Sequence, residues 1–343
     1  MSFIDNKGTF IIMLIEIRRI RFMKHPTFLL IILFASAIIF ACSPDSVEPT
    51  KDIQLAESFI GKDYDSVIYY AKNYLAGNEN EEYQYYGHIV SGYAYLQKEE
   101  FIKATAHYLQ ANELIPERER YQQDKSDILM TLGYIAKTFL AHEHAILYYH
   151  EALSVVTDSE KAGILYNLGN VCKNMEEYDS AIVQYQSCIN DAKKFDQYKR
   201  IIKAKVQLGT VYNKQDLLDE ARKEFDDVID NKFELNTQTY IARALYYKAN
   251  NEISRGKFEE ALDLFNQSLS LESSITDKFI ANMDMGHCYL KMEDYQNALS
   301  ALQTAENLYA DAKPYPEYAE VFNLLATAYE KRGNTEAAVL SLR

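Results

Sequence analysis

One helix-turn-helix pattern recurs seven times in this 343-residue chain, and its period constrains the fold more than any other feature. The segment LYNLGNVCKNMEEYDSAIVQYQSCI, residues 165–189, shows the pattern clearly. Leu168 and Cys172 fall on one face of a first helix, a four-residue turn follows, and Ala181 and Tyr185 line a second helix. Successive units begin 36 to 41 residues apart. Self-similarity at such a period predicts an all-α array of stacked helix pairs.

Each unit carries a small residue on both helices, at the point where the two helices would cross. Larger side chains at these positions would force the paired helices apart. The first-helix residue is glycine or alanine in all seven units: Gly92, Gly133, Gly169, Gly209, Ala249, Gly286 and Ala326. The second-helix residue is alanine in all seven: Ala104, Ala145, Ala181, Ala221, Ala261, Ala298 and Ala338.

These positions and spacings resemble the tetratricopeptide repeat, a helix-turn-helix unit with a small residue on each helix at the crossing. The resemblance covers residues 85–343 as seven repeats, the last incomplete, and residues 52–84 as a degenerate opening repeat with Val67 in the alanine position. It implies a right-handed superhelical solenoid in which the first helices line a groove.

The seventh repeat stops five residues after Ala338, inside its second helix. We therefore expect the intact protein to continue beyond Arg343, because solenoids place a polar capping helix over the final repeat. Without that cover, an apolar face should be left bare, made of Leu325, Tyr329, Val339 and Leu342.

Residues 1–41 have the pattern of a secretory signal peptide. Phe28–Ala41 is a run of fourteen residues without charge, shorter than the ~20 that a permanent membrane span needs. The end of this run, IFAC, resembles a bacterial lipobox, which implies that Cys42 becomes a lipid-modified N-terminus and residues 42–51 a flexible tether. The alternative is an ordinary signal peptide with an incidental cysteine. A second apolar patch in residues 1–22 favours a translation start at Met23.

The chain is strongly acidic, with a formal charge of −14. Because residues 1–41 carry a net charge of +3, the remainder carries −17. Such a body repels phosphate backbones, so we expect no nucleic acid partner. The four cysteines do not form a disulfide framework at this length, and three of them lie on apolar helix faces, where buried thiols are expected: Cys172, Cys188 and Cys288.

No catalytic constellation stands out in the sequence, and we expect no enzyme activity, cofactor, metal or small-molecule substrate. HEH at residues 142–144 lacks the H-E-x-x-H spacing of a zinc site and is placed in the turn between two helices. Lys248 and Glu252 occupy positions that are apolar in most sister units. We expect them to form an i,i+4 ion pair or to be exposed by a local twist, with a buried ligand-binding pair as the alternative.

Function should then depend on a surface, and the repeat register identifies groove residues on the first helices. They are amides, tyrosines and basic residues, which suit an extended peptide because amides pair with backbone groups and cations with carboxylates. The candidates are Tyr134, Lys137, Tyr166, Asn167, Asn170, Lys173, Asn174, Lys203, Gln207, Asn213, Lys214, Arg243, Tyr246, Tyr247 and Asn250.

The leading hypothesis is a non-enzymatic, lipid-anchored scaffold that binds a peptide or protein in this groove. Its N-terminal lipid would attach it to a membrane of the bacterial cell envelope, facing the periplasm or the cell surface. The combination of lipobox and repeats resembles Bacteroidota tetratricopeptide proteins, which implies the sensory or interaction part of an envelope signalling system. A structural assembly adaptor of the outer membrane is the alternative, and an envelope enzyme acting on glycans is a third.

Overall fold

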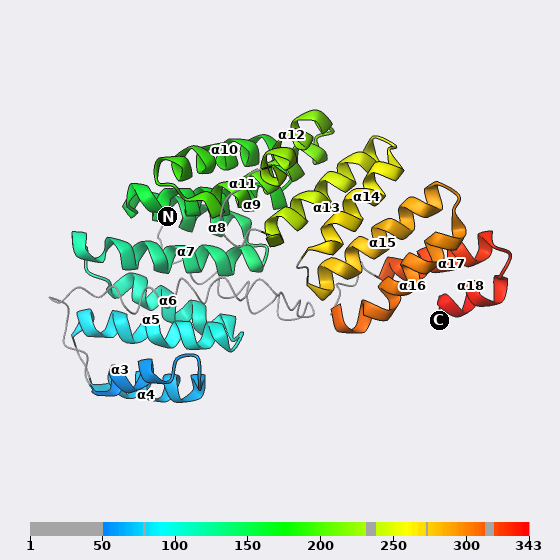
Figure 1. The fold of residues 1–343 in the computed structure, drawn as a ribbon. Coiled ribbons are helices and arrows are strands. Elements are labelled where there is room, and N and C mark those ends of the chain that lie inside the picture. The colour runs from blue at the N-terminus through cyan, green and yellow to red at the C-terminus, as the bar shows by residue number, and fades with distance from the viewer. Residues whose placement is uncertain (1–50, 78–79, 231–237, 272–273, 313–318, 343) are drawn as a thin grey trace. The chain divides into compact units, whose positions relative to one another are not determined.

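The computed structural model describes residues 51–77, 80–230, 238–271, 274–312 and 319–342. The expected signal peptide, Cys42 and nearly all of the tether lie outside these described residues. Within the described part of the chain every regular element is a helix (Figure 1). This confirms the helical repeat architecture that the sequence period predicts.

The chain divides into two compact units, residues 1–175 and residues 176–343. The described helices of unit 1 are α3 (Lys51–Ser58), α4 (Tyr64–Gly77), α5 (Glu81–Gln97), α6 (Phe101–Leu114), α7 (Gln122–Thr138), α8 (His142–Val155) and α9 (Asp158–Asn174). Those of unit 2 are α10 (Tyr178–Lys194), α11 (Tyr198–Lys214), α12 (Leu218–Ile229), α13 (Gln238–Ser254), α14 (Phe258–Ser270), α15 (Ile275–Lys291), α16 (Tyr295–Ala312), α17 (Glu320–Lys331) and α18 (Thr335–Ser341).

Within each unit, helices that are consecutive in the sequence pack as hairpins, and the first helix of one hairpin also contacts the first helix of the next. Unit 1 has one continuous apolar core, which runs from Ile53 on α3 to Val171 on α9. The core of unit 2 consists of successive clusters between neighbouring hairpins. Aromatic residues fill the centres of both units, among them Tyr149, Phe225 and Phe265.

The small residues at the helix crossings are buried as the sequence predicts. The second-helix alanine is buried in all seven repeats, and Val67 is buried in the opening pair. In the repeats with a glycine on the first helix, that glycine faces a large side chain of the second helix, as Gly92 faces Tyr108 and Gly286 faces Leu302. A Cβ atom built on Gly209 would lie 2.5 Å from the Phe225 ring, and one built on Gly133 would lie 2.6 Å from the Tyr149 ring. The crossings at Gly133 and Gly209 therefore leave no room for a methyl group.

Gly209→Ala should lower the free energy of unfolding by about 1–3 kcal/mol, because the added methyl overpacks the crossing of α11 with α12. Gly77→Ala is the matched control, since nothing lies within 4 Å of a Cβ atom at that helical glycine. Urea unfolding followed by circular dichroism measures both. Equal stability of the two variants would show that the crossing tolerates the methyl group.

The turn inside most hairpins uses one residue in the left-handed region, the second after the first helix ends. In two hairpins this residue is Gly256 or Gly333, but in the turn between α7 and α8 it is Leu140, with φ of 58°. A side chain with a Cβ atom is strained in that conformation by roughly 1–2 kcal/mol. The Leu140 side chain is 72% exposed, so it adds little packing that would offset the strain.

Leu140→Gly should therefore raise the free energy of unfolding, by up to about 1 kcal/mol after the loss of chain entropy in the unfolded state. The reverse change, Gly256→Leu, should lower it. Thermal unfolding of the two variants checks the sign of each effect, and a loss of stability in Leu140→Gly contradicts the strain argument.

Two local expectations from the sequence are wrong. The HEH segment does not lie in the turn, because His142 starts α8 and the segment forms its first helical turn. Lys248 and Glu252 do not pair with each other: Lys248 Nζ lies 2.6 Å from Asp226 Oδ1, and Glu252 is 0% exposed. Lys248 reaches α12 near the surface, whereas Glu252 points into a core position that holds tyrosine in several sister repeats.

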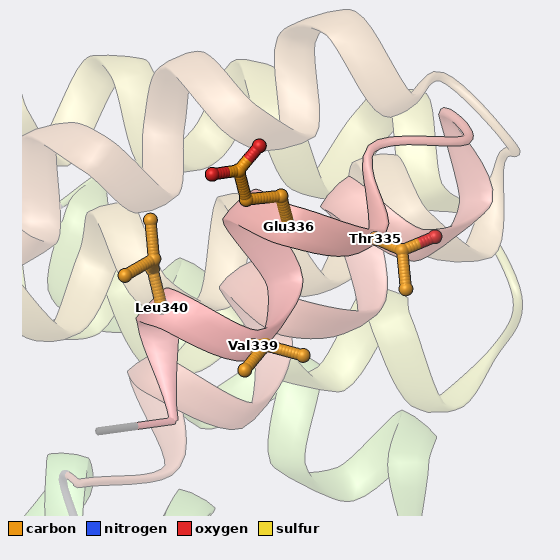
Figure 2. A pocket seen from close by; sticks show the side chains of 4 residues that line it. All are labelled: Thr335, Glu336, Val339 and Leu340. Atoms are coloured by element: carbon orange, nitrogen blue, oxygen red, sulfur yellow. The ribbon is translucent and has the colours of Figure 1, made fainter.

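The last described hairpin also differs from expectation. Leu325 on α17 is fully buried in the apolar cluster around Phe279, so it is covered. Tyr329 is partly buried, and its hydroxyl accepts a hydrogen bond of 2.8 Å from Gln303 Nε2. In this hairpin the large apolar side chains that are exposed lie on α18 and directly after it: Val339, Leu340 and Leu342. Figure 2 shows an open depression on this helix, lined by Thr335, Glu336, Val339 and Leu340.

Candidate functional site

The fifteen residues that the repeat register assigns to the groove all keep contact with solvent. They lie on the first helices of four repeats, α7 and α9 in unit 1 and α11 and α13 in unit 2. None is buried, and three are exposed: Asn174, Lys214 and Arg243. We call the solvent-facing sides of these helices the first-helix surface of each unit.

In unit 1, the first-helix surface brings together Tyr134 and Lys137 on α7. Lys137 Nζ lies 5.1 Å from the centre of the Tyr134 ring, within the range of a cation–π interaction. Burial lowers the pKa of Lys137. The candidates on α9 are partly buried, except for exposed Asn174: Tyr166, Asn167, Asn170 and Lys173.

Unit 1 also carries carboxylates that the sequence reasoning missed. The Tyr85 hydroxyl donates to Asp124 Oδ2 at 3.1 Å, and Gln123 Nε2 donates to Asp127 Oδ2 at 3.3 Å. Burial, together with the charges of Glu160 and Asp124, raises the pKa of Asp127 to about 7. The signal was present in the sequence, because Asp127 precedes Tyr134 by seven residues, which is two turns along the same helical face.

In unit 2, several predicted residues are tied into a polar network that joins α13 to α15. The Tyr246 hydroxyl donates to Asp284 Oδ2 at 2.6 Å, and Asn250 Nδ2 donates to the Tyr246 carbonyl at 3.3 Å. Burial raises the pKa of Asp284 to about 6, against the lowering effect of the hydrogen bond from Tyr246. Tyr246 and Asn250 therefore position the helices as well as facing solvent.

A second network joins α11 to α13. Asn213 Nδ2 donates to the Tyr247 carbonyl at 3.4 Å, and Asn213 Oδ1 accepts from Asn251 Nδ2 at 2.6 Å. Asn251 is fully buried and also donates to the Leu218 carbonyl at 2.9 Å. Gln207 and Lys214 lie on the same helix as Asn213, partly buried and exposed respectively.

Basic and aromatic side chains gather where α11 and α13 begin. Lys203 Nζ lies 5.7 Å from the centre of the Tyr240 ring. Burial lowers the pKa of Lys203 to about 8, and the charges of Arg200, Arg243 and Lys199 lower it further. Tyr240 was not predicted, although it precedes Arg243 by three residues on the same helical face. We call this group the cationic patch, made of Lys199, Arg200, Lys203, Tyr240, Arg243 and Tyr247.

Other expected features of the chain can be placed in the described residues. Cys172, Cys188 and Cys288 are buried thiols, as their apolar faces predict. Burial raises the pKa of Cys288 to about 12, so its thiol is protonated at neutral pH. In the described ranges, no three His, Cys, Asp or Glu side chains are arranged to hold a metal ion. None of the described helices combines the length and the apolar character that crossing a membrane requires.

The stacked hairpins, their small crossing residues and the polar first-helix surfaces define a helical-repeat protein. Family models for the tetratricopeptide repeat match residues 162–190 and residues 277–343. Between and before these ranges the same small residues occupy the same buried crossings. The chain therefore carries tetratricopeptide repeats at residues 162–190 and 277–343. No curated protein matches the sequence.

Solved structures with this fold include a tetratricopeptide repeat protein from Parabacteroides merdae. It has 19% identity and a TM-score of 0.56, over 75% of this chain and 90% of that one. The apo form of the quorum sensor NprR from B. thuringiensis has 13% identity and a TM-score of 0.55, over 85% and 96%. The apo form of RapI has 15% identity and a TM-score of 0.53, over 75% and 94%. At these identities the likeness concerns the fold.

Proposed function

We propose that the protein is a non-enzymatic scaffold that binds a peptide or protein segment on its first-helix surfaces. One observation carries the proposal: the amides, tyrosines and cations predicted from the repeat register all retain solvent contact on consecutive first helices. Solvent-accessible amides and cations can pair with the backbone and the carboxylates of an extended chain. The similarity to NprR, a quorum sensor, supports a sensory role for such binding.

The lipobox-like sequence before Cys42 supports an anchored location for this scaffold. With its lipid in a membrane of the bacterial envelope, the protein would present its repeats to the periplasm or to the cell surface. A flexible tether of residues 42–51 would let the repeats meet a partner without a fixed orientation. In this arrangement the chain serves as the interaction part of an envelope signalling system.

Site-specific photocrosslinking in the native cell tests the proposal. A photoreactive amino acid is placed at Asn174 on α9 or at Lys214 on α11, both exposed members of the first-helix surfaces. Lys223, exposed on the second helix α12, is the matched control. We expect a discrete adduct from the two first-helix positions and not from the control. Identical adducts from all three positions, or none from the first-helix positions, would overturn the proposal.

A further inference from the structure

We propose that His88 and His107 form a proton-sensitive contact between α5 and α6, which holds the two helices together near neutral pH and is lost when both rings are protonated. The inference concerns unit 1 and does not depend on the proposed peptide-binding function. It rests on the geometry of the two rings and on the side chains that surround them.

The two imidazole rings meet across the hairpin of α5 and α6. His88 Nδ1 lies 2.9 Å from His107 Nδ1, within the range of a hydrogen bond. The ring centres are 5.1 Å apart, which is close to this distance plus the two ring radii, so the two nitrogens point at each other. Because a neutral imidazole has one donor and one acceptor nitrogen, the ring with hydrogen on Nδ1 donates to the bare Nδ1 of the other ring.

The contact can take up one proton from solvent but not two. The first added proton can bind Nε2 of the donor ring, whose Nδ1–H still donates to the other histidine. A second proton must bind the acceptor Nδ1. Both facing nitrogens then carry hydrogen, the hydrogen bond is lost and two like charges repel each other, so the rings have to separate.

The setting of the two rings disfavours their charged forms. Both rings are partly buried, and burial lowers the pKa of both, that of His107 to about 4 with the charge of His88 adding to the effect. The His107 ring stacks on Tyr95, with the ring centres 5.4 Å apart. A tyrosine face can stabilise a cation, but Lys103 Nζ already lies 5.1 Å from the centre of this ring.

The charges on the neighbouring helices do not offset a positive pair. Lys72 on α4 acts on His107 and lowers its pKa further. Among the described residues, no acidic side chain contributes to the pKa shift of either histidine. Carboxylates of the helices packed around this hairpin have other partners: Glu57 on α3 with Tyr86, Asp65 on α4 with Lys98, Glu100 with Lys103, Asp124 on α7 with Tyr85, and Asp127 on α7 with Gln123.

The stability of the hairpin should therefore fall as the pH is lowered. A histidine of the unfolded chain has a pKa of about 6.5, above the values that burial imposes on His88 and His107 in the fold. The contact contributes its full stability above about pH 6.5. This contribution is lost progressively as the pH falls toward about 4, where His107 is protonated in the fold as well.

His107→Asn separates the proton effect from the packing of α5 and α6. The asparagine amide can donate to His88 Nδ1 or accept from its Nδ1–H, so the contact can persist in both protonation states of His88. Thermal unfolding of the full chain is followed by circular dichroism at pH 7 and at pH 4.5. Between these values, the Tm of the wild type should fall at least about 3 °C more than the Tm of His107→Asn. Carboxyl groups that titrate in this range, such as Asp127, are common to both proteins and cancel in the comparison.

His88→Asn tests the other ring in the same way, and His150→Asn is the matched control, because His150 is exposed on α8. The control should keep the wild-type loss of Tm. An equal loss in the wild type and in both contact variants would overturn the inference. A control that reduces the loss as much as the contact variants do would overturn it too, since the effect would then come from any histidine.

Nuclear magnetic resonance of isotope-labelled histidines tests the contact in the folded wild type. The rings of His88 and His107 should titrate below the ordinary value of about 6.5. Replacing one of them by asparagine should raise the titration midpoint of the other, because a like charge is removed from its neighbour. Midpoints at the ordinary value, or a midpoint that does not respond to the replacement, would contradict a shared contact.

Discussion

Replacing Arg222 by methionine should lower the free energy of unfolding by about 3 kcal/mol, the low end of the range for breaking a buried ion pair. Arg222 Nη1 lies 3.4 Å from Glu252 Oε1, and Glu252 is completely buried. Neither carboxylate oxygen of Glu252 accepts a hydrogen bond from the described residues. Without Arg222, Lys257, 3.6 Å from Oε2, would be the ion-pair partner of Glu252 that remains among the described residues. Urea unfolding measures the loss.

Glu252→Leu should leave the free energy of unfolding unchanged or raise it, by at most about 4 kcal/mol, because it removes the buried charge itself. The cations would not be left alone, since Arg222 and Lys257 both also pair with Glu260. When Glu252→Leu is already present, Arg222→Met should lower the free energy of unfolding much less than it does in the wild type. Such non-additivity is the signature of a direct coupling between two side chains.

Lys194→Met is the control for a surface pair, because Lys194 pairs with Asp191 at 2.6 Å on the exposed side of α10. It should cost no more than about 1 kcal/mol. If Arg222→Met costs as little as Lys194→Met, the Glu252 carboxylate is not held by Arg222.

Cys42→Ser should release the protein from the membrane fraction and abolish its labelling by a clickable palmitate. The physical reason is the nucleophile: a thiolate is alkylated readily, whereas a serine hydroxyl is a far weaker nucleophile at neutral pH. Without acylation, the chain loses about 0.8 kcal/mol of membrane affinity for each CH₂ group that the lipid would have buried. The lipid modification that the lipobox resemblance implies would bury many such groups, so this is the largest change expected from any single substitution here.

Cys172→Ala is the matched control, because it removes a buried thiol of α9 that the lipid cannot reach. It should keep both the palmitate label and the membrane location. Labelling of Cys42→Ser to the same degree as the wild type would remove the lipid anchor from the proposed function and leave the peptide-binding surfaces unaffected.

Much of the fold could be predicted because its determinants are local in the sequence. A glycine or alanine on each first helix and an alanine on each second helix mark where the two helices cross. All of the second-helix alanines proved to be buried, as did Val67 in the opening pair. Helical periodicity also identified which side chains keep contact with solvent, since none of the fifteen candidates is buried.

The partners of those side chains could not be predicted in the same way. The register placed Lys203 and Arg243 on the same surface, but it did not show that Tyr240 would lie under the lysine. It assigned Tyr246 to the groove without showing that its hydroxyl is held by Asp284, 38 residues later. Such contacts join neighbouring repeats, so they depend on how far one hairpin is shifted and rotated against the next.

The sequence by itself therefore determined the helix pairs, their crossings and the faces that meet water, because the 3.6-residue period and the size of a side chain act within one hairpin. Only the tertiary structure decided that Glu252 is buried between Arg222 and Lys257 instead of pairing with Lys248. Helical spacing made Lys248 and Glu252 neighbours, but the packing of α12 and α14 against α13 offered each of them a different partner. The reason is that an ion pair depends on the distances between side chains of different helices. The spacing of residues along one helix does not determine those distances.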